Sequence, residues 1–171
     1  GKVECTLEGA RALYSHLKYP YIDLLYVNTD GMEYWMLKTF LHECEGIDSK
    51  PNVIVCKINN IIGTRPLTVP YVPPEKRQDM FDTNYVGASV GALHTLLTSD
   101  YEFVGTTKYA VHAVYVKRRC IPGPQTGDPS GLKTTFYLPT FDEYFELFKN
   151  VRYGFHNRWP LVRSKFWITV R

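Results

Sequence analysis

The amino-acid sequence predicts a three-layered α/β fold, and two observations support this prediction. Short β-rich runs at 22–27 and 53–58 alternate with helical patterns along the chain. Such alternation favours parallel strands with helices on both faces of the sheet. Two more β-rich runs, at 101–107 and 110–117, are separated by only a few residues, which indicates a closing antiparallel hairpin.

The first half of the chain is expected to fold as helix, strand, helix, strand. Apolar residues recur at helical spacing over 7–18 and again at about 32–44. The run at 22–27 is apolar on both sides of the chain, which is typical of a strand buried between two layers. The run at 53–58 repeats this pattern.

A long segment without periodicity, 61–81, follows the second strand and contains four prolines. It exceeds an ordinary connector, and loops of that length are usually functional. A helix is then expected at about 84–98, before the hairpin. Near the C-terminus, Thr140 and Glu143 form a capping-box pair that predicts a short helix at 140–150.

The helix expected at 84–98 raises a question, because the stretch DTNYVGASVGALHTL places glycine inside it. Glycine in a helix interior costs roughly 0.5–1 kcal/mol relative to alanine. Gly87, Ala88, Gly91 and Ala92 would share one side of this helix. We expect these small residues to let its backbone lie close to the sheet, so leucine at position 87 or 91 should disrupt folding.

Length and composition indicate a folded chain of about one domain. The chain has 171 residues, of which 44% are hydrophobic and 22% charged, and this excludes a disordered protein. No apolar run approaches the roughly 18 residues of a membrane helix, so the sequence predicts a soluble protein. We divide it into a compact part at 1–120 and, at 121–171, a Pro/Gly loop, a short helix and a basic, aromatic tail.

Metal and hydrolase chemistry find no support in the sequence. The four cysteines are far apart and form no C-x-x-C pair, so we expect buried or half-buried thiols in a reducing compartment. The five histidines are scattered, and neither G-x-S-x-G nor H-E-x-x-H occurs.

The C-terminal tail at 149–171 is basic and contains no Asp or Glu, although the net charge of the chain is only +3. One interpretation is a tail docked on its own domain with its charges in water. The other is a surface for RNA or an acidic protein partner. The residues that would form this partner-binding surface are Arg158, Trp159, Arg163, Lys165 and Trp167.

Polar residues follow the predicted strands at the edge where parallel sheets bind ligands. Asn28, Asp30 and Gly31 come after the first strand, and Asn59 after the second. The helix expected at 84–98 is preceded by Asp82, and its free N–H groups could hold an anion. Taken singly, each of these clusters is explained better as a turn or a helix cap than as a binding site.

The order and spacing of several stretches resemble a known family. They are DLLYVNTDGMEYWMLKTF, NVIVCKIN, LTVPY and DTNYVGASVGALHTLLTSDYEFVGTTKYAVHAVYV. Together they resemble the second half of FkbM-like S-adenosylmethionine-dependent methyltransferases, over residues 22–117. That family shows a strand ending in D-x-D-G or D-x-E-G, an E-Y-N-like triplet, a TxYFGASLxAL helix and a GxNAFFV strand.

The resemblance implies a Rossmann-like class I methyltransferase sheet of order 3-2-1-4-5-7-6. This chain would supply the half-sheet 4-5-7-6, with the last strand of the chain antiparallel. The resemblance also implies S-adenosylmethionine as the cofactor, with Asp30 and Asn59 as catalytic residues. The cofactor-binding residues would be Asn28, Gly31, Asp82 and Tyr85.

Departures from the family pattern separate two hypotheses about function. Asn28 replaces an Asp, Lys57 replaces the Glu of the triplet, and His112 replaces an Asn. No glycine-rich turn is present that could seat the adenosine. These departures favour a degenerate, methyltransferase-like pseudoenzyme that serves as a structural subunit of a larger complex. The alternative is an active methyltransferase whose cofactor half is a missing segment or another chain.

A half-sheet would leave the strand at 22–27 as an uncovered edge, and such an edge invites pairing. We therefore expect this strand to pair with a second copy or with a chain that supplies strands 1–3. The expected location is intracellular, with a mitochondrion or another organelle as the compartments considered.

Overall fold

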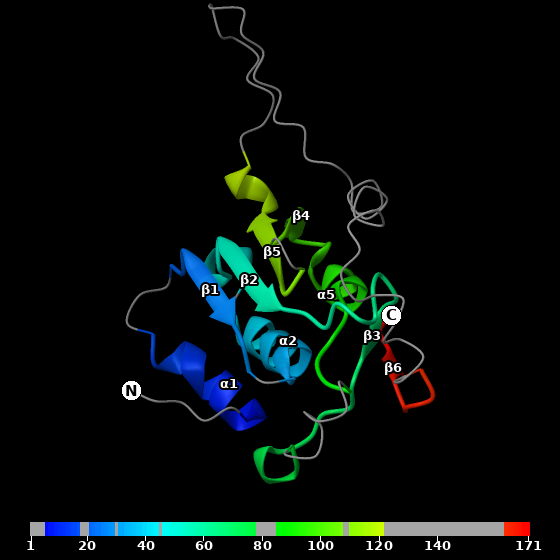
Figure 1. Cartoon of the computed structure of the whole chain (residues 1–171). Coiled ribbons are helices and arrows are strands. Elements are labelled where there is room, and N and C mark those ends of the chain that lie inside the picture. The colour runs from blue at the N-terminus through cyan, green and yellow to red at the C-terminus, as the bar shows by residue number, and fades with distance from the viewer. Residues whose placement is uncertain are drawn as a thin grey trace, which may run out of the picture.

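The sheet at the centre of the molecule has four strands. The computed structural model describes residues 6–17, 21–29, 31–44, 46–77, 85–107, 110–121 and 163–171. The strands are β1 (Leu24–Val27), β2 (Val53–Lys57), β4 (Tyr101–Thr106) and β5 (His112–Lys117). They lie in the order β1-β2-β5-β4, as Figure 1 shows. The α/β class is confirmed.

The directions of the strands follow from how the chain connects them. β1 and β2 are parallel, because the chain returns through a helix between them. β5 is antiparallel to both β2 and β4, and it lies between them. The four runs therefore lie in the expected spatial order, with β5, the last of the four along the chain, antiparallel.

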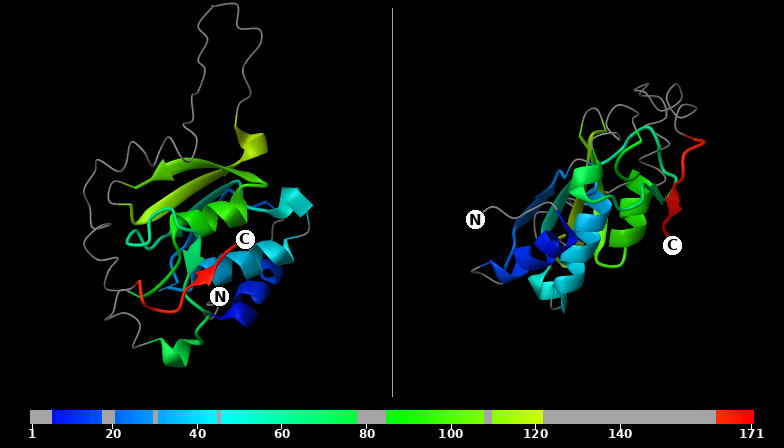
Figure 2. Two further views of the ribbon diagram at one scale, coloured as in Figure 1. Left: turned by 90° about the vertical axis from the view of Figure 1, so that its right-hand side faces the viewer. Right: turned by 90° about the horizontal axis from the view of Figure 1, so that it is seen from below.

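Helices cover one face of this sheet. They are α1 (Leu7–Ser15), α2 (Glu33–Glu43), the single turn α3 (Gly46–Ser49) and α5 (Val90–Leu97). α1 begins at Thr6, whose side chain accepts a hydrogen bond from the Gly9 N–H at 3.0 Å. α1 packs on α2, and α2 lies beside α5 (Figure 2).

Alternation along the strands builds the main core. Every second residue of β2 and β5 is buried on the helix-covered face, as the period of two in a strand requires. Tyr101 and Phe103 of β4 follow the same alternation up to a bulge between Phe103 and Gly105. These side chains and those of α2 and α5 form one hydrophobic cluster. Its strand residues are Val27, Ile54, Cys56, Tyr101, Phe103, Ala113 and Tyr115.

The expected third layer is absent from the part of the chain that the structure describes, so that prediction is wrong for these residues. Leu24 and Tyr26 of β1 point to the other face and are 58% and 54% exposed. Val104 of β4 lies on this face too and is 36% exposed. The apolar run at 22–27 thus predicted a strand correctly, but the further inference that this strand is covered on both faces was wrong for the described residues.

A small second sheet ties the end of the chain to the segment 61–81. β3 (Leu67–Thr68) pairs antiparallel with β6 (Ile168–Thr169), and both lie on the same side of the molecule in Figure 1. A short 3-10 helix, η1 (Pro74–Lys76), follows β3. The segment expected to be a functional loop therefore also holds the C-terminus.

The helix expected at 84–98 is shorter, and the glycine hypothesis is corrected. α5 begins only after Ser89, whose side chain accepts the Ala92 N–H at 2.9 Å. Gly87 precedes the helix and has φ +71°, a backbone conformation that favours glycine. At Gly91 a Cβ would lie 2.0 Å from the carbonyl oxygen of Thr64. The close neighbour of Gly91 is thus the loop at Thr64, while other residues of α5 pack against the sheet.

Other predictions about single residues have mixed outcomes. Cys44 and Cys56 are buried as expected, whereas Cys120 is exposed, and no disulfide joins these three. Cys5 and the helix predicted at 140–150 lie outside the described residues. Within the described ranges, none of the helices is long and apolar enough to cross a membrane.

Candidate functional site

A pocket of about 190 Å³ lies at the carboxyl ends of β1 and β2. Parallel strands place the loops that follow them at one edge of the sheet, which is where ligands bind in open α/β sheets. The loops after β1 and β2 meet there with the segment before α5. The lining residues are Gly31, Glu33, Lys57, Ile58, Asn59, Asn60, Ile61, Val86, Gly87 and Val111.

Glu33, the first residue of α2, is the most deeply buried charged side chain of this pocket, with 1% of its surface exposed. Its Oε1 accepts hydrogen bonds from the N–H groups of Thr29 and Gly31, at 3.1 and 3.0 Å. A carboxylate that accepts backbone N–H bonds fixes the turn that carries them. Glu33 therefore shapes the loop between β1 and α2.

Asn59 joins the loop after β2 to the segment before α5. Its Nδ2 donates to the Val86 carbonyl at 2.7 Å, and its Oδ1 accepts the Ile61 N–H at 3.0 Å. The N–H of Gly87 donates to the Gly31 carbonyl at 3.1 Å, which closes the ring of contacts. Both ends of the Asn59 amide are thus bound to the protein itself, which is a structural use of this side chain.

Gly87 leaves the space in which the second oxygen of Glu33 lies. A Cβ at this position would be 3.3 Å from Glu33 Oε2, closer than most real Cβ contacts. The positive φ of Gly87 also disfavours any other residue. The pocket therefore depends on glycine here, for room and for backbone conformation.

The electrostatics of the site are set by burial. Burial raises the pKa of the Cys56 thiol well above its usual 9.0, and the nearby charge of Glu33 raises it further. Cys56 is thus held as a neutral thiol and not as a nucleophilic thiolate.

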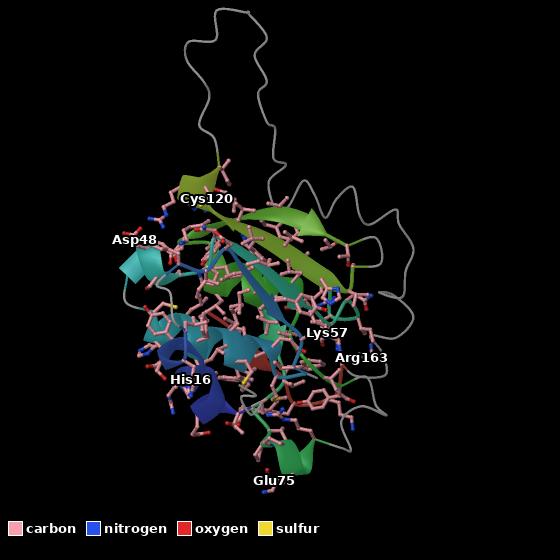
Figure 3. The ribbon with its side chains drawn as sticks, turned by 90° about the vertical axis from the view of Figure 1, so that its left-hand side faces the viewer. His16, Asp48, Lys57, Glu75, Cys120 and Arg163 are labelled. Carbon is pink, nitrogen blue, oxygen red and sulfur yellow. The ribbon has the colours of Figure 1, made fainter. Side chains whose placement is uncertain are left out.

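The rings of Tyr26 and His112 lie on the open face of the sheet, near the end at which the pocket lies. Lys57 is the register partner of His112, and Nε2 of His112 lies 2.8 Å from the hydroxyl of Tyr26. Figure 3 shows Lys57 at this end of the sheet and Cys120 near the other. His112 thus places a hydrogen-bonded imidazole beside Lys57.

Of the four predicted catalytic or cofactor-binding residues that the structure describes, Gly31 and Asn59 line this pocket. Asn28 lines a second groove, described below. Tyr85 packs against Trp167, with ring centroids 4.8 Å apart, and does not line the pocket. Asp30 and Asp82 lie outside the described residues.

Sequence reasoning missed Glu33 and misplaced Gly87. The available signal for Glu33 was an acidic residue in the first turn of a predicted helix, two positions after a glycine. Such a residue reads as a helix cap, because helix N-termini favour carboxylates. The burial of Glu33 appears only in the tertiary structure, where Gly87 lies beside its carboxylate.

The second groove, of about 310 Å³, runs beside β1. Its walls come from the strand itself, from α1 and from α2. The lining residues are Gly9, Ala10, Leu13, Leu25, Tyr26, Val27, Asn28, Thr29, Met36, Leu37 and Phe40. Most of these side chains are apolar, so the groove suits an apolar occupant better than a charged one.

The basic tail is divided between the fold and the surface. Arg163 and Lys165 are exposed, whereas Trp167 is partly buried against a small cluster with Met32, Met36 and Val69. Trp167 therefore contributes to the fold. Arg158 and Trp159 lie outside the described residues.

Comparison with known proteins identifies no relative. The chain matches no protein-family model, no curated protein and no solved structure. Among the described residues, no group of three or more His, Cys, Asp or Glu side chains could hold a metal ion.

Proposed function

We propose that this chain is a methyltransferase-like interaction module, which serves as a structural subunit of a larger assembly. The observation that carries the proposal is the edge strand β1, whose outward side chains Leu24 and Tyr26 are 58% and 54% exposed. Edge strands of soluble proteins are usually short, charged or covered. β1 is apolar over its whole length, Leu24 to Val27.

The surroundings of β1 support a partner strand. The strand ends the sheet among the described residues, so one row of its backbone N–H and C=O groups has no neighbouring strand. The apolar groove beside it lies between the strand and α1. A strand added there would pair with β1 through its backbone and place alternate side chains in the groove and on the open face.

The use of Asn59 also favours an interaction module over an enzyme. The resemblance gives this residue a catalytic role, yet its amide is bound at both ends to the chain. Its partner in that role, Asp30, lies outside the described residues. The order β1-β2-β5-β4, in turn, supports the proposed relation to half of a methyltransferase sheet.

The mass of the purified chain in solution tests the proposal. Without its natural partner, the chain is expected to self-associate through β1. Leu24→Lys places a charge on the exposed side of this edge and should give a monomer. Val104→Lys is the matched control, because Val104 lies on the same face but on the opposite edge strand, β4.

Two results would overturn the edge proposal. One is a wild-type chain that is folded, stable and monomeric at high concentration. The other is equal loss of self-association in Leu24→Lys and Val104→Lys, because the contact would then not depend on β1.

S-adenosylmethionine-dependent methyl transfer is the second candidate, with the cofactor half supplied by a missing segment or another chain. One observation favours it: a pocket lies at the carboxyl ends of β1 and β2 and contains Gly31 and Asn59. Calorimetric titration with S-adenosylmethionine and S-adenosylhomocysteine tests it. Micromolar binding would support the enzyme, whereas no binding at millimolar ligand by the folded chain would support the interaction module.

A further inference from the structure

One oxygen of the Glu33 carboxylate remains available to a ligand in the pocket at the carboxyl ends of β1 and β2. Glu33 is 1% exposed, and both hydrogen bonds that it accepts from described residues go to Oε1. Oε2 accepts no hydrogen bond from any part of the chain that the structure describes. It lies beside Gly87, which lines the pocket and has no side chain to cover it.

A carboxylate oxygen that faces the pocket without a donor from the chain is best paired by a charged donor. Transfer of a charged group out of water is unfavourable unless the group is paired. Hydrogen bonds between a cation and a carboxylate are about twice as strong as neutral ones. The group that suits Oε2 is therefore a cation that carries N–H bonds.

The walls of the pocket define the rest of such a ligand. Four of the lining side chains are apolar: Ile58, Ile61, Val86 and Val111. The volume of about 190 Å³ corresponds to roughly six water molecules at about 30 Å³ each. This space accommodates a short alkyl chain behind a single polar head.

We propose that this pocket binds a small alkylammonium group, with its cationic head at Glu33 Oε2 and its alkyl stem against the apolar walls. Lys57 lies at the rim, since alternation along β2 turns it away from the buried face. Its positive charge opposes the ligand, so removing it should strengthen binding. The site is separate from the β1 edge, so it stands or falls independently of the proposed function.

The test is a titration of the ¹⁵N-labelled chain with n-butylammonium, n-butanol and butyrate, followed by amide NMR. The Gly31 N–H donates to Glu33, and the Gly87 N–H donates to Gly31, so both amide signals report on the carboxylate. We expect n-butylammonium to shift both signals saturably in the millimolar range. Butanol and butyrate should leave them unchanged at the same concentrations.

Three variants test whether the binding of n-butylammonium depends on the charge of Glu33. Glu33→Gln keeps an oxygen for the two backbone donors but removes the charge, and it should weaken binding at least about tenfold. Glu43→Gln is the matched control, because Glu43 lies on the same helix with its side chain 35% exposed. It should bind as the wild type does. Lys57→Gln should bind about two- to fivefold more tightly, because a like charge near the ligand is removed.

Several results would overturn the proposal. They are a response to butanol or butyrate equal to that to n-butylammonium, unchanged affinity in folded Glu33→Gln, and no saturable shift with any probe. If Glu33→Gln does not fold, Lys57→Gln decides, and unchanged or weaker binding by that variant would refute the site.

Discussion

Gly91→Ala tests whether the contact between α5 and the loop at 61–66 is what requires glycine in this helix. A Cβ at position 91 would lie 2.0 Å from the Thr64 oxygen, 2.7 Å from the Thr64 carbonyl carbon and 3.0 Å from the Arg65 carbonyl carbon. Real Cβ atoms essentially never come closer than 3.0 Å to such atoms. The helix and the loop would therefore have to separate by about 1 Å, against the packing of the core.

That separation is resisted by hydrogen bonds around Ser89. Its side chain donates to the Arg65 carbonyl, and it accepts the Leu67 N–H at 3.2 Å. The Ser89 N–H donates to the Leu67 carbonyl at 2.9 Å. Overpacking of a core typically costs about 1–3 kcal/mol, while alanine returns roughly 0.5–1 kcal/mol of helix propensity. Since the neighbour here is backbone and cannot rotate away, we expect a net loss of about 2 kcal/mol.

The assay is urea unfolding followed by circular dichroism. With a slope of about 2 kcal/mol per molar urea, the midpoint of Gly91→Ala should fall by about 1 M. Thr95→Ala is the control, because Thr95 lies one turn later on the same helix and is exposed. It removes the hydrogen bond from the Thr95 hydroxyl to the Gly91 carbonyl, 3.0 Å, and adds no atom near the loop. It should change the free energy of unfolding by less than about 0.5 kcal/mol. A Gly91→Ala variant as stable as the wild type would refute the steric argument.

Two further predictions concern the pocket and the core. Asn59→Ala should lower the free energy of unfolding by about 2 kcal/mol, because it leaves the Val86 carbonyl and the Ile61 N–H without their partner. Asn28 is exposed, so Asn28→Ala is the control and should unfold at nearly the same temperature as the wild type. An Asn59→Ala variant as stable as the wild type would argue against the structural role of Asn59. Stability should also fall as the pH rises above the usual thiol pKa of 9.0, by up to about 1.4 kcal/mol per pH unit from Cys56. At these pH values the folded state keeps the Cys56 proton, whereas the unfolded state has lost it. In urea titrations, the free energy of unfolding of Cys56→Ala should therefore fall less steeply than that of the wild type between about pH 8 and pH 10. An unchanged dependence on pH would contradict the assignment to Cys56.

Local patterns in the sequence predicted the helices and strands because those patterns reflect short-range physics. The period of two in β2 and β5 and the helical spacing in α2 depend only on neighbouring residues. The short connection between β4 and β5 was sufficient to predict their antiparallel pairing. The spatial order of the strands was obtained through the family resemblance, and not from periodicity.

The candidate site was predicted only in part. Strand ends indicated the edge of the sheet at which the pocket lies, since loops after parallel strands meet at one edge, and Gly31 and Asn59 line that pocket. The catalytic and cofactor-binding roles of these residues stay predictions. Glu33 was missed because its burial is caused by the segment at 86–88, which is far away in the sequence. A charged residue near a helix start gives no sign of whether another segment will cover it.

The sequence by itself determined where the strands of the main sheet and the helices α1 and α2 lie, and that polar residues end β1 and β2, because propensity and periodicity are local. The tertiary structure decided the rest. It left Leu24 and Tyr26 exposed, placed Gly91 against Thr64 and paired Ile168 with Thr68 across the chain. Each of these outcomes depends on which distant segment packs against a residue. Burial and close contact are properties of two segments together, so the local sequence of one segment does not predict them.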